Sequence, residues 1–295
     1  MTAVTLVHLS DLHFGRDADL AQTREIAALM PLLAPDAVCV SGDLTQRARH
    51  GEFQAALAFL ERLGAVAPTI RLPGNHGVQW WESPFHLLGT ERLYAKYRRW
   101  MGVELTPTLE RPGMMVCAAL TSHGVAAGSM TWNLNDMAVK GHLPASELER
   151  VRRLFEGAAP GAARVLMLHH NVLRGNISQR MGLARWEEAQ RRLIALGPDV
   201  ILCGHDHEEA TALLGERIVV SCSSTHTPRT RGKRRSAFNV LRLEPGRELV
   251  RGDGPQVRPP QARPPPEHGH DRHQVRPHHP HPTPPGVRSW FWSTE

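Results

Sequence analysis

Five short polar blocks, each placed just after an apolar run, constrain this chain more than any other feature of its 295 residues. The apolar runs have the length and composition of buried strands: Thr5–Leu9, Ala37–Val40, Thr69–Leu72, Arg164–Leu168 and Val200–Cys203. The blocks that follow them are Asp11-Leu12-His13, Gly42-Asp43, Gly74-Asn75-His76, His169-His170 and Gly204-His205-Asp206-His207. In an α/β sheet, functional groups gather beyond the carboxyl ends of the strands, so we expect the five blocks to meet in one crevice.

The blocks contain the ligand types that divalent first-row metals prefer. Carboxylate, amide oxygen and imidazole suit Mn, Fe, Zn or Co, and the absence of cysteine from the blocks argues against a structural zinc site. Two cations about 3.5–4 Å apart hold the phosphoryl oxygens of a phosphate ester and generate hydroxide near neutral pH. The blocks therefore predict a dinuclear centre that hydrolyses phosphoesters with a metal-bound hydroxide.

The ligands divide between two metal ions. One carboxylate must bridge the pair, and Asp43 is the natural candidate because it stands alone on its own tight turn. The other ligands of the first ion are predicted to be Asp11, His13 and His207. Those of the second ion are predicted to be Asn75, His169 and His205. The one-residue gaps in D-x-H and H-x-H predict side chains on the same side of an extended segment.

Three further residues are candidates for contact with the substrate. His76 follows a metal ligand, and we predict that it stabilises the phosphoryl charge and protonates the leaving oxygen. His170 either contacts the substrate or supports a ligand. Arg174, five residues after His169, either clamps a phosphate or forms a surface salt bridge.

Helical and strand patterns alternate through residues 1–250. Apolar residues at helical spacing predict helices over Leu20–Leu33, Phe53–Leu63, Leu148–Phe155 and Trp186–Leu196. Strand-like runs without helices between them follow at Met114–Thr121, Ile218–Ser221 and Ala237–Leu243. This order predicts an α/β fold with two sheets packed face to face and helices outside.

Residues 251–295 differ in character from the predicted domain at 1–250. They hold 11 of the 23 prolines and 6 of the 18 histidines, with almost no apolar periodicity. Such a segment buries too little surface to offset its ordering entropy, so we predict a disordered Pro/His/Arg-rich tail. A frameshifted reading of a GC-rich gene is an alternative origin for so abrupt a change.

Charge and hydropathy limit the partners. The net charge is +6, and the most basic stretch, Arg229–Arg235, could contact nucleic acid, although a solvated loop is the more common meaning. No apolar run approaches the roughly 20 residues of a membrane span. The first strand begins near Val4, too early for a signal peptide, which predicts a cytoplasmic protein.

The four cysteines are predicted to be buried reduced thiols. The sequence does not predict an oligomeric state.

Taken in order, the five blocks resemble the D-x-H, G-D, G-N-H-[D/E], H and G-H-x-H pattern of the calcineurin-like metallophosphoesterase superfamily, over residues 4–243. The surrounding sequences HLSDLHFG, VSGDLTQRA, LPGNHGVQWW and LMLHHN are most similar to its bacterial cyclic-nucleotide-phosphodiesterase-like branch. The resemblance implies a four-layer α/β/β/α sandwich of two mixed β-sheets, two divalent metal ions, and His169 rather than His170 as a ligand. It also implies a phosphodiesterase acting on a small-molecule phosphoester.

The chain departs from the family pattern at two positions. Gly77 stands where an acid usually follows G-N-H, and Asn171 stands where proline is common. The missing acid commonly supports a neighbouring ligand. Alternative functions on the same fold are a nucleotide-sugar or lipid pyrophosphatase, a nuclease and a non-catalytic scaffold.

Overall fold

The computed structural model describes residues 3–244, except 17, 19, 80–90, 125–138, 177 and 226–236, together with strands at 275–278 and 287–294. The basic stretch Arg229–Arg235 and most of the 251–295 segment lie outside the described residues. In the described part, no helix is both long and apolar enough to cross a membrane.

The first sheet has the strand order β11-β12-β10-β1-β2-β3. Its strands are β1 (Val4–Leu9), β2 (Ala37–Val40), β3 (Thr69–Arg71), β10 (Ala237–Leu243), β11 (Val275–His278) and β12 (Val287–Thr294). The neighbours β1, β2 and β3 run parallel, whereas β10 is antiparallel to β1, so the sheet is mixed.

The second sheet has the order β4-β5-β6-β7-β9-β8. Its strands are β4 (Thr108–Arg111), β5 (Met114–Ala118), β6 (Ala163–His170), β7 (Val200–Gly204), β8 (Ala210–Leu214) and β9 (Ile218–Cys222). The four central strands are parallel, and an antiparallel strand closes each side. This sheet is also mixed, as the resemblance implied.

The helices are α1 (Leu20–Leu33), α2 (His50–Gly64), α3 (Ala95–Met101), α4 (Ala145–Glu156) and α5 (Trp186–Leu196), and two 3-10 turns are η1 (Asn75–Gly77) and η4 (Arg92–Tyr94). The bounds predicted for α1 and α5 are those observed, and α2 and α4 begin three residues before the first apolar residue of their periodic patterns. Helix α3 was not predicted because its seven residues make only two turns, too few to display a periodic apolar face.

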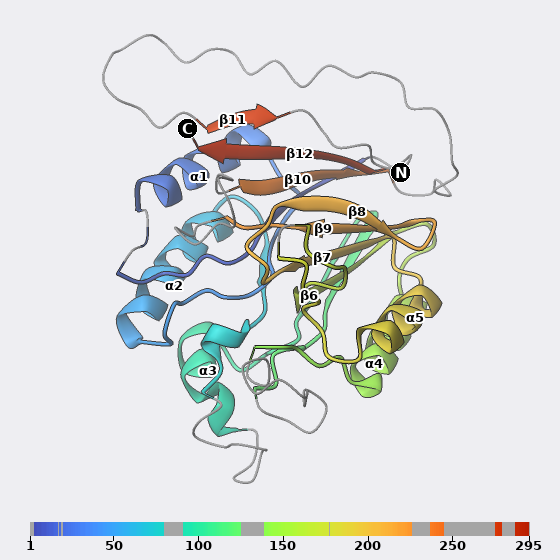
Figure 1. The fold of residues 1–295 in the computed structure, drawn as a ribbon. Helices are drawn as coiled ribbons and strands as arrows, with labels where there is room; N and C mark the ends of the chain where they lie inside the picture. The colour runs from blue at the N-terminus through green and yellow to red at the C-terminus, as the bar shows by residue number, and fades with distance from the viewer. Residues whose placement is uncertain are drawn as a thin grey trace.

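Buried side chains sort the molecule into four layers. On β1, Val7 and Leu9 pack with residues of α1 and α2, whereas Val4 and Leu6 pack against the second sheet. The outer face of the second sheet packs against α4 and α5. Figure 1 shows this arrangement, with α1 and α2 beside the first sheet and α4 and α5 together beside the second. The structure confirms the predicted α/β/β/α sandwich of two mixed β-sheets.

Part of the predicted disordered tail is ordered as strands. β12 pairs antiparallel with β10 from Ala237↔Ser293 to Leu243↔Val287, and β11 pairs with β12. For 275–278 and 287–294 the structure therefore differs from the prediction. The physical reason is that the outer edge of β10 carries backbone N–H and C=O groups that need partners. A strand can supply those partners without any apolar periodicity in its own sequence.

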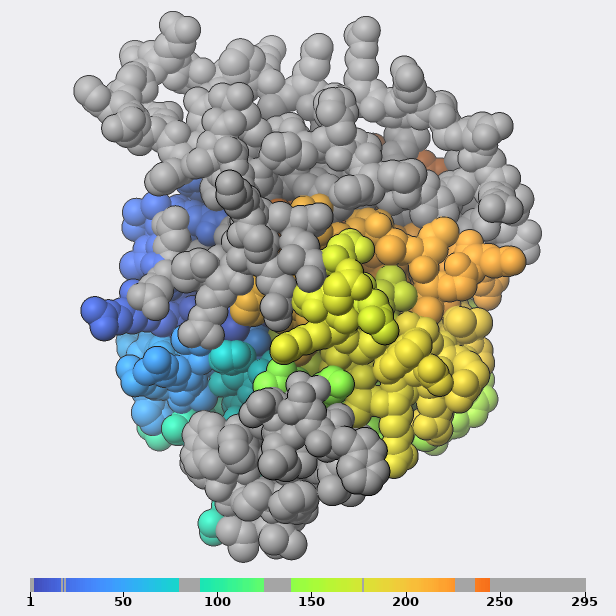
Figure 2. Space-filling model, viewed as in Figure 1, coloured from blue at the N-terminus to red at the C-terminus, as the bar shows by residue number. Residues whose placement is uncertain are grey.

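The fold brings the five polar blocks to one end of the sandwich. They lie at the carboxyl ends of β1, β2, β3, β6 and β7, which are parallel neighbours within their own sheets. In Figure 2, the blue and cyan N-terminal residues form one side of the described molecule and the green and yellow residues form the other. The blocks thus come from both halves of the chain.

Candidate metal centre

The first ligand set is built from Asp11, His13, Asp43 and His207, whose ligand atoms all lie within 4.8 Å of one another. Nε2 of His13 is 3.0 Å from Nε2 of His207 and 3.7 Å from Oδ2 of Asp43. Nε2 of His207 is also 3.7 Å from Oδ1 of Asp11. Buried nitrogen and oxygen lone pairs that converge in this way suit a divalent cation.

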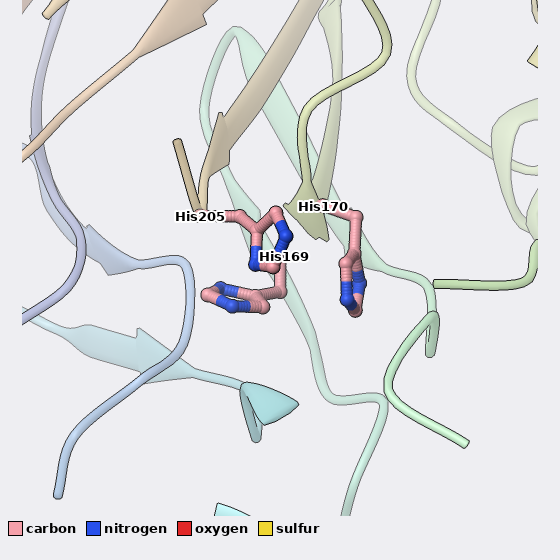
Figure 3. A group of neighbouring side chains, drawn as sticks. All are labelled: His169, His170 and His205. Carbon is pink, nitrogen blue, oxygen red and sulfur yellow. The ribbon is translucent and has the colours of Figure 1, made fainter. Parts of the chain in front are cut away.

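The second set is built around the amide oxygen of Asn75. Oδ1 of Asn75 is 2.9 Å from Nε2 of His169 and 3.1 Å from Nδ1 of His205. The backbone carbonyl of Ser41 accepts from Nδ1 of His169 at 2.8 Å, so that Nε2 is the nitrogen that can bind a metal once its proton is lost. Figure 3 shows the ring of His169, at the end of β6, close to that of His205, which directly follows β7. These atoms fit a second cation.

Asp43 joins the two sets. Its Oδ2 atom lies 3.7 Å from Nε2 of His13 in the first set and 3.3 Å from Nε2 of His169 in the second. Its Oδ1 atom accepts a hydrogen bond from the backbone N–H of His76 at 2.9 Å, which fixes the carboxylate plane. The structure thus brings together all seven predicted ligands, with Asp43 in the position that a bridging ligand needs.

Five of the seven predicted ligands lie on left-handed backbone. Nine non-glycine residues in the described part have positive φ, and five of them belong to the ligand set: Asp11, His13, Asp43, His205 and His207. The prediction of extended D-x-H and H-x-H segments is therefore wrong. The tight turns after β1, β2 and β7 bend the chain back toward the crevice. Such strain, about 1–3 kcal/mol per residue, is typical of functional sites.

Two glycines allow this close packing. A Cβ atom on Gly42, which has φ +102°, would lie 2.5 Å from Nδ1 of His169. A Cβ atom on Gly204 would lie 1.9 Å from Oγ of Ser10 and 2.4 Å from Oδ2 of Asp11. Any side chain at either position would displace a ligand or its support.

Burial and charge set the protonation of the ligands. Burial lowers the pKa of His13 to about 3 and holds the pKa of His205 well below its usual range. Burial alone would also lower the pKa of His169, but the Asp43 carboxylate outweighs burial and raises it to about 9. Burial opposes ionisation of Asp43, yet His169 and His76 hold its pKa well below the usual value. In the metal-free protein the site therefore pairs an ionised Asp43 with a protonated His169, beside neutral His13 and His205.

His76 faces the open side of the site. Its side chain is 28% exposed, against 1% for Asp43, and Nε2 lies 4.0 Å from Oδ2 of Asp43. Nδ1 donates to the backbone carbonyl of Gln46 at 2.8 Å. Because Nδ1 is occupied by that bond, Nε2 is the atom that can exchange a proton with a bound molecule.

His170 is enclosed by protein. It is 1% exposed, and Nε2 donates to the carbonyl of Val139 at 3.0 Å. Nδ1 lies 2.8 Å from the hydroxyl of Thr121, which donates to it because a neutral ring has only one N–H. Figure 3 shows its ring beside those of His169 and His205, with ring centroids 5.0 and 4.5 Å away. Of the two roles predicted for His170, this geometry favours support of the ligands over contact with the substrate.

Arg174 lies apart from the ligand set. It is exposed, and its guanidinium donates to the carbonyl of Gln179 at 3.4 Å. It lines a cavity of about 40 Å³ with Asn171, Glu208 and Cys222. Contact between Arg174 and a phosphate stays a prediction.

Asn171 was predicted only to alter the loop that shapes the substrate entrance, and no hydrogen-bonding role was predicted for it. It is 4% exposed and contacts Cys203 of β7 and Asp206 in the turn after β7. The only signal in the sequence was its departure from the proline that is common at this position.

Comparison with known proteins agrees with the fold and the site. The calcineurin-like phosphoesterase pattern matches residues 4–209, which include every predicted ligand. The chain belongs to the calcineurin-like phosphoesterase family. Dinuclear metal dependence is a property of this family, and the two ligand sets fit it. A search of curated protein sequences found no match.

Solved structures share the calcineurin-like fold at low sequence identity. A purple acid phosphatase from seeds of yellow lupin (Lupinus luteus) is 14% identical, with a TM-score of 0.58, over 82% of this chain and 49% of the lupin chain. A dimetal phosphatase from Danio rerio is 12% identical, with a TM-score of 0.51, over 81% of this chain and 92% of that chain. The chain thus spans about half the length of the lupin protein, and these likenesses concern the fold.

Proposed function

We propose that this protein is a metal-dependent phosphodiesterase that hydrolyses small-molecule phosphodiesters at a dinuclear centre. The observation that carries the proposal is the position of Asp43 Oδ2, within 3.7 Å of His13 Nε2 and within 3.3 Å of His169 Nε2. A single carboxylate oxygen that lies between two sets of ligands is the arrangement that holds two cations close together. When bound, the ions provide positive charge for the phosphoryl oxygens and supply hydroxide near neutral pH.

The charges of the protein suit an anionic substrate. Two divalent cations bring a charge of +4, and the carboxylates of Asp11 and Asp43 offset half of it. His13 and His205 add little charge because their pKa values are low. His169 has a raised pKa, but it becomes neutral when it loses its proton to bind a metal. The remaining positive charge favours a phosphodiester anion over a neutral molecule.

His76 supplies the general acid in this proposal. Departure of an alkoxide from phosphorus requires a proton, and a positioned imidazole contributes typically 10²–10⁴-fold. The carbonyl of Gln46 accepts the Nδ1 proton and orients the ring, so that a second proton on Nε2 can pass to the leaving oxygen. The edge-to-face contact with His13, with ring centroids 4.7 Å apart, holds the ring in place.

The preference for diesters is supported by the resemblance of the sequences around the ligands to the cyclic-nucleotide-phosphodiesterase-like branch. Purified protein should be assayed with bis(p-nitrophenyl) phosphate and p-nitrophenyl phosphate after removal of metals and reloading with Mn²⁺, Fe²⁺, Zn²⁺ or Co²⁺. We expect faster hydrolysis of the diester and loss of activity on chelation. Equal or faster hydrolysis of the monoester would contradict the diester preference.

The natural substrate can be sought with a panel of cyclic nucleotides, glycerophosphodiesters, nucleotide sugars and oligonucleotides. Hydrolysis of nucleotide sugars alone would favour the pyrophosphatase, and hydrolysis of oligonucleotides alone would favour the nuclease. A protein that binds two metals but hydrolyses none of these compounds would favour the scaffold.

A further inference from the structure

Asn171 connects the two segments that carry the ligands of the second sheet. Its side-chain Nδ2 donates to Oδ2 of Asp206 at 3.0 Å, and both residues are 4% exposed. Asn171 directly follows His169-His170, and Asp206 lies between His205 and His207. One buried hydrogen bond therefore joins the segment after β6 to the turn after β7.

The orientation of the Asn171 amide is fixed by its surroundings. Oδ1 accepts from the backbone N–H of Leu173 at 3.1 Å. The thiols of Cys203 and Cys222 also donate to this oxygen, with Sγ atoms 3.7 and 3.5 Å away. Reversing the amide would set its NH₂ group against the N–H of Leu173 and its oxygen against a carboxylate. Oδ1 thus faces donors and Nδ2 faces the acceptor, which leaves the amide one arrangement.

The backbone ladder between β6 and β7 is irregular near the ligands and ends just before these segments begin. β6 and β7 pair in regular register up to Met167↔Leu202, and the next pair is His170↔Gly204, with an irregularity between. The last pair of the ladder, His170↔Gly204, therefore lies directly before Asn171 and His205. His205 and His207 then adopt φ values of 76° and 54°, which persist only where surrounding contacts enforce them.

We propose that Asn171 is a positioning residue that, through Asp206, holds the turn of His205 and His207 in its ligand-binding conformation. The proposal rests on the metal centre proposed above. Because His207 belongs to the first ligand set and His205 to the second, loss of this hydrogen bond weakens both metal sites. Loss of contacts that orient metal ligands typically costs about 10–100-fold in metal affinity, and we expect a loss of this size.

Exchange of the two side chains provides the test. In Asn171→Asp, two buried carboxylates face each other, and the turn should be displaced. In Asp206→Asn, the new amide oxygen can still accept from Asn171, so the effect should be small. In the double variant Asn171→Asp/Asp206→Asn, the donor and acceptor are interchanged and the hydrogen bond is restored. Asn176→Asp, at an exposed position close by in the sequence, controls for the added charge.

Two measurements are needed for each variant. Calorimetric titration with Mn²⁺ reports affinity at each site. Amide hydrogen exchange of residues 204–207 in the metal-free protein reports the order of the turn without any metal. We expect Asn171→Asp to bind both ions about 10–100-fold more weakly and to exchange faster, and the double variant to recover most of both losses.

The alternatives give different results. A double variant as impaired as Asn171→Asp, or an Asn171→Asp variant with unchanged exchange and affinity, would overturn the proposal. A merely structural role would lower the melting temperature of Asn171→Asp without changing exchange of the turn or metal affinity. If the unaltered protein binds no metal, the metal centre fails as a proposal, while exchange in the metal-free protein still decides whether Asn171 orders the turn.

Discussion

Oδ2 of Asp43 lies 3.3 Å from Nε2 of His169, and the two side chains control each other's charge. The carboxylate raises the pKa of His169 to about 9 against the effect of burial, and His169 helps to hold the pKa of Asp43 low. In the metal-free protein this contact is an ion pair. The same two atoms are the predicted ligands of the second metal ion, so metal and proton compete for one place.

Competition between metal and proton predicts a pH-dependent affinity. Below pH 9, His169 is protonated in the metal-free protein and must lose a proton to bind a metal. Affinity at the second site should therefore rise by up to about tenfold per pH unit from pH 6.5 to 8 and level off near pH 9. Calorimetry with Zn²⁺ in buffers of different ionisation enthalpy should detect about one proton released at this site. Affinity independent of pH over this range would show that His169 is neutral before metal binds.

Replacement of Asp43 should affect both ions. We expect Asp43→Ala to abolish turnover and to lower the metal content well below that of the unaltered protein, because a bridging ligand serves both sites. Elemental analysis and the bis(p-nitrophenyl) phosphate assay test this expectation. Glu149→Ala, on the exposed face of α4, removes a carboxylate far from the site and is the matched control. Retention of two metals with near-normal activity would rule out the bridging role.

Replacement of His76 should separate chemistry from metal binding. In His76→Ala we expect the metal content to persist while kcat falls by roughly 10²–10⁴, the usual range for loss of a general acid. The fall should be smaller for p-nitrophenyl esters, whose leaving group needs no proton, than for alkyl esters. The two classes of ester should be compared at saturating metal. Equal losses for both would exclude the general-acid role.

Replacement of Gly77 can test whether the acid that usually follows G-N-H supports metal binding. Its φ is not among the positive values, and a Cβ atom added there would find its nearest neighbour, Cδ2 of Tyr97, at 3.9 Å. The Cβ atom of an aspartate at this position therefore strains neither backbone nor packing. We expect Gly77→Asp to bind metal more tightly, or to raise kcat at limiting metal, with little change in melting temperature. Gly77→Ala controls for the added Cβ. Weaker metal binding with lower stability would refute a supporting role for the acid.

Removal of the C-terminal strands should affect stability rather than the site. In a variant ending at residue 273, β10 loses the strand that pairs with it from Ala237 to Leu243, and its edge is left to water. We expect a lower melting temperature and a greater tendency to associate, with unchanged metal affinity, since β10 carries none of the predicted ligands. An unchanged melting temperature would instead support the prediction of a disordered tail over the whole of 251–295.

Local patterns in the sequence were enough to predict much of this protein. The apolar runs indicated the strands that precede the ligands, and helical spacing gave α1 and α5 with their observed bounds. The order of the ligand blocks indicated the family. These features could be read from the chain because they depend on residue type and on spacing over a few positions.

The tertiary structure decided what depends on distant parts of the chain. The backbone N–H of His205 donates to the carboxylate of Asp11 across 194 positions, and no local pattern encodes that contact. The left-handed turns of the ligands are strained locally and exist only because the two sheets and their loops enforce them. The hydrogen bond between Asn171 and Asp206 arises because β6 and β7 end side by side. The sequence by itself determined which side chains could bind metal, whereas packing of the two sheets determined where each of them lies.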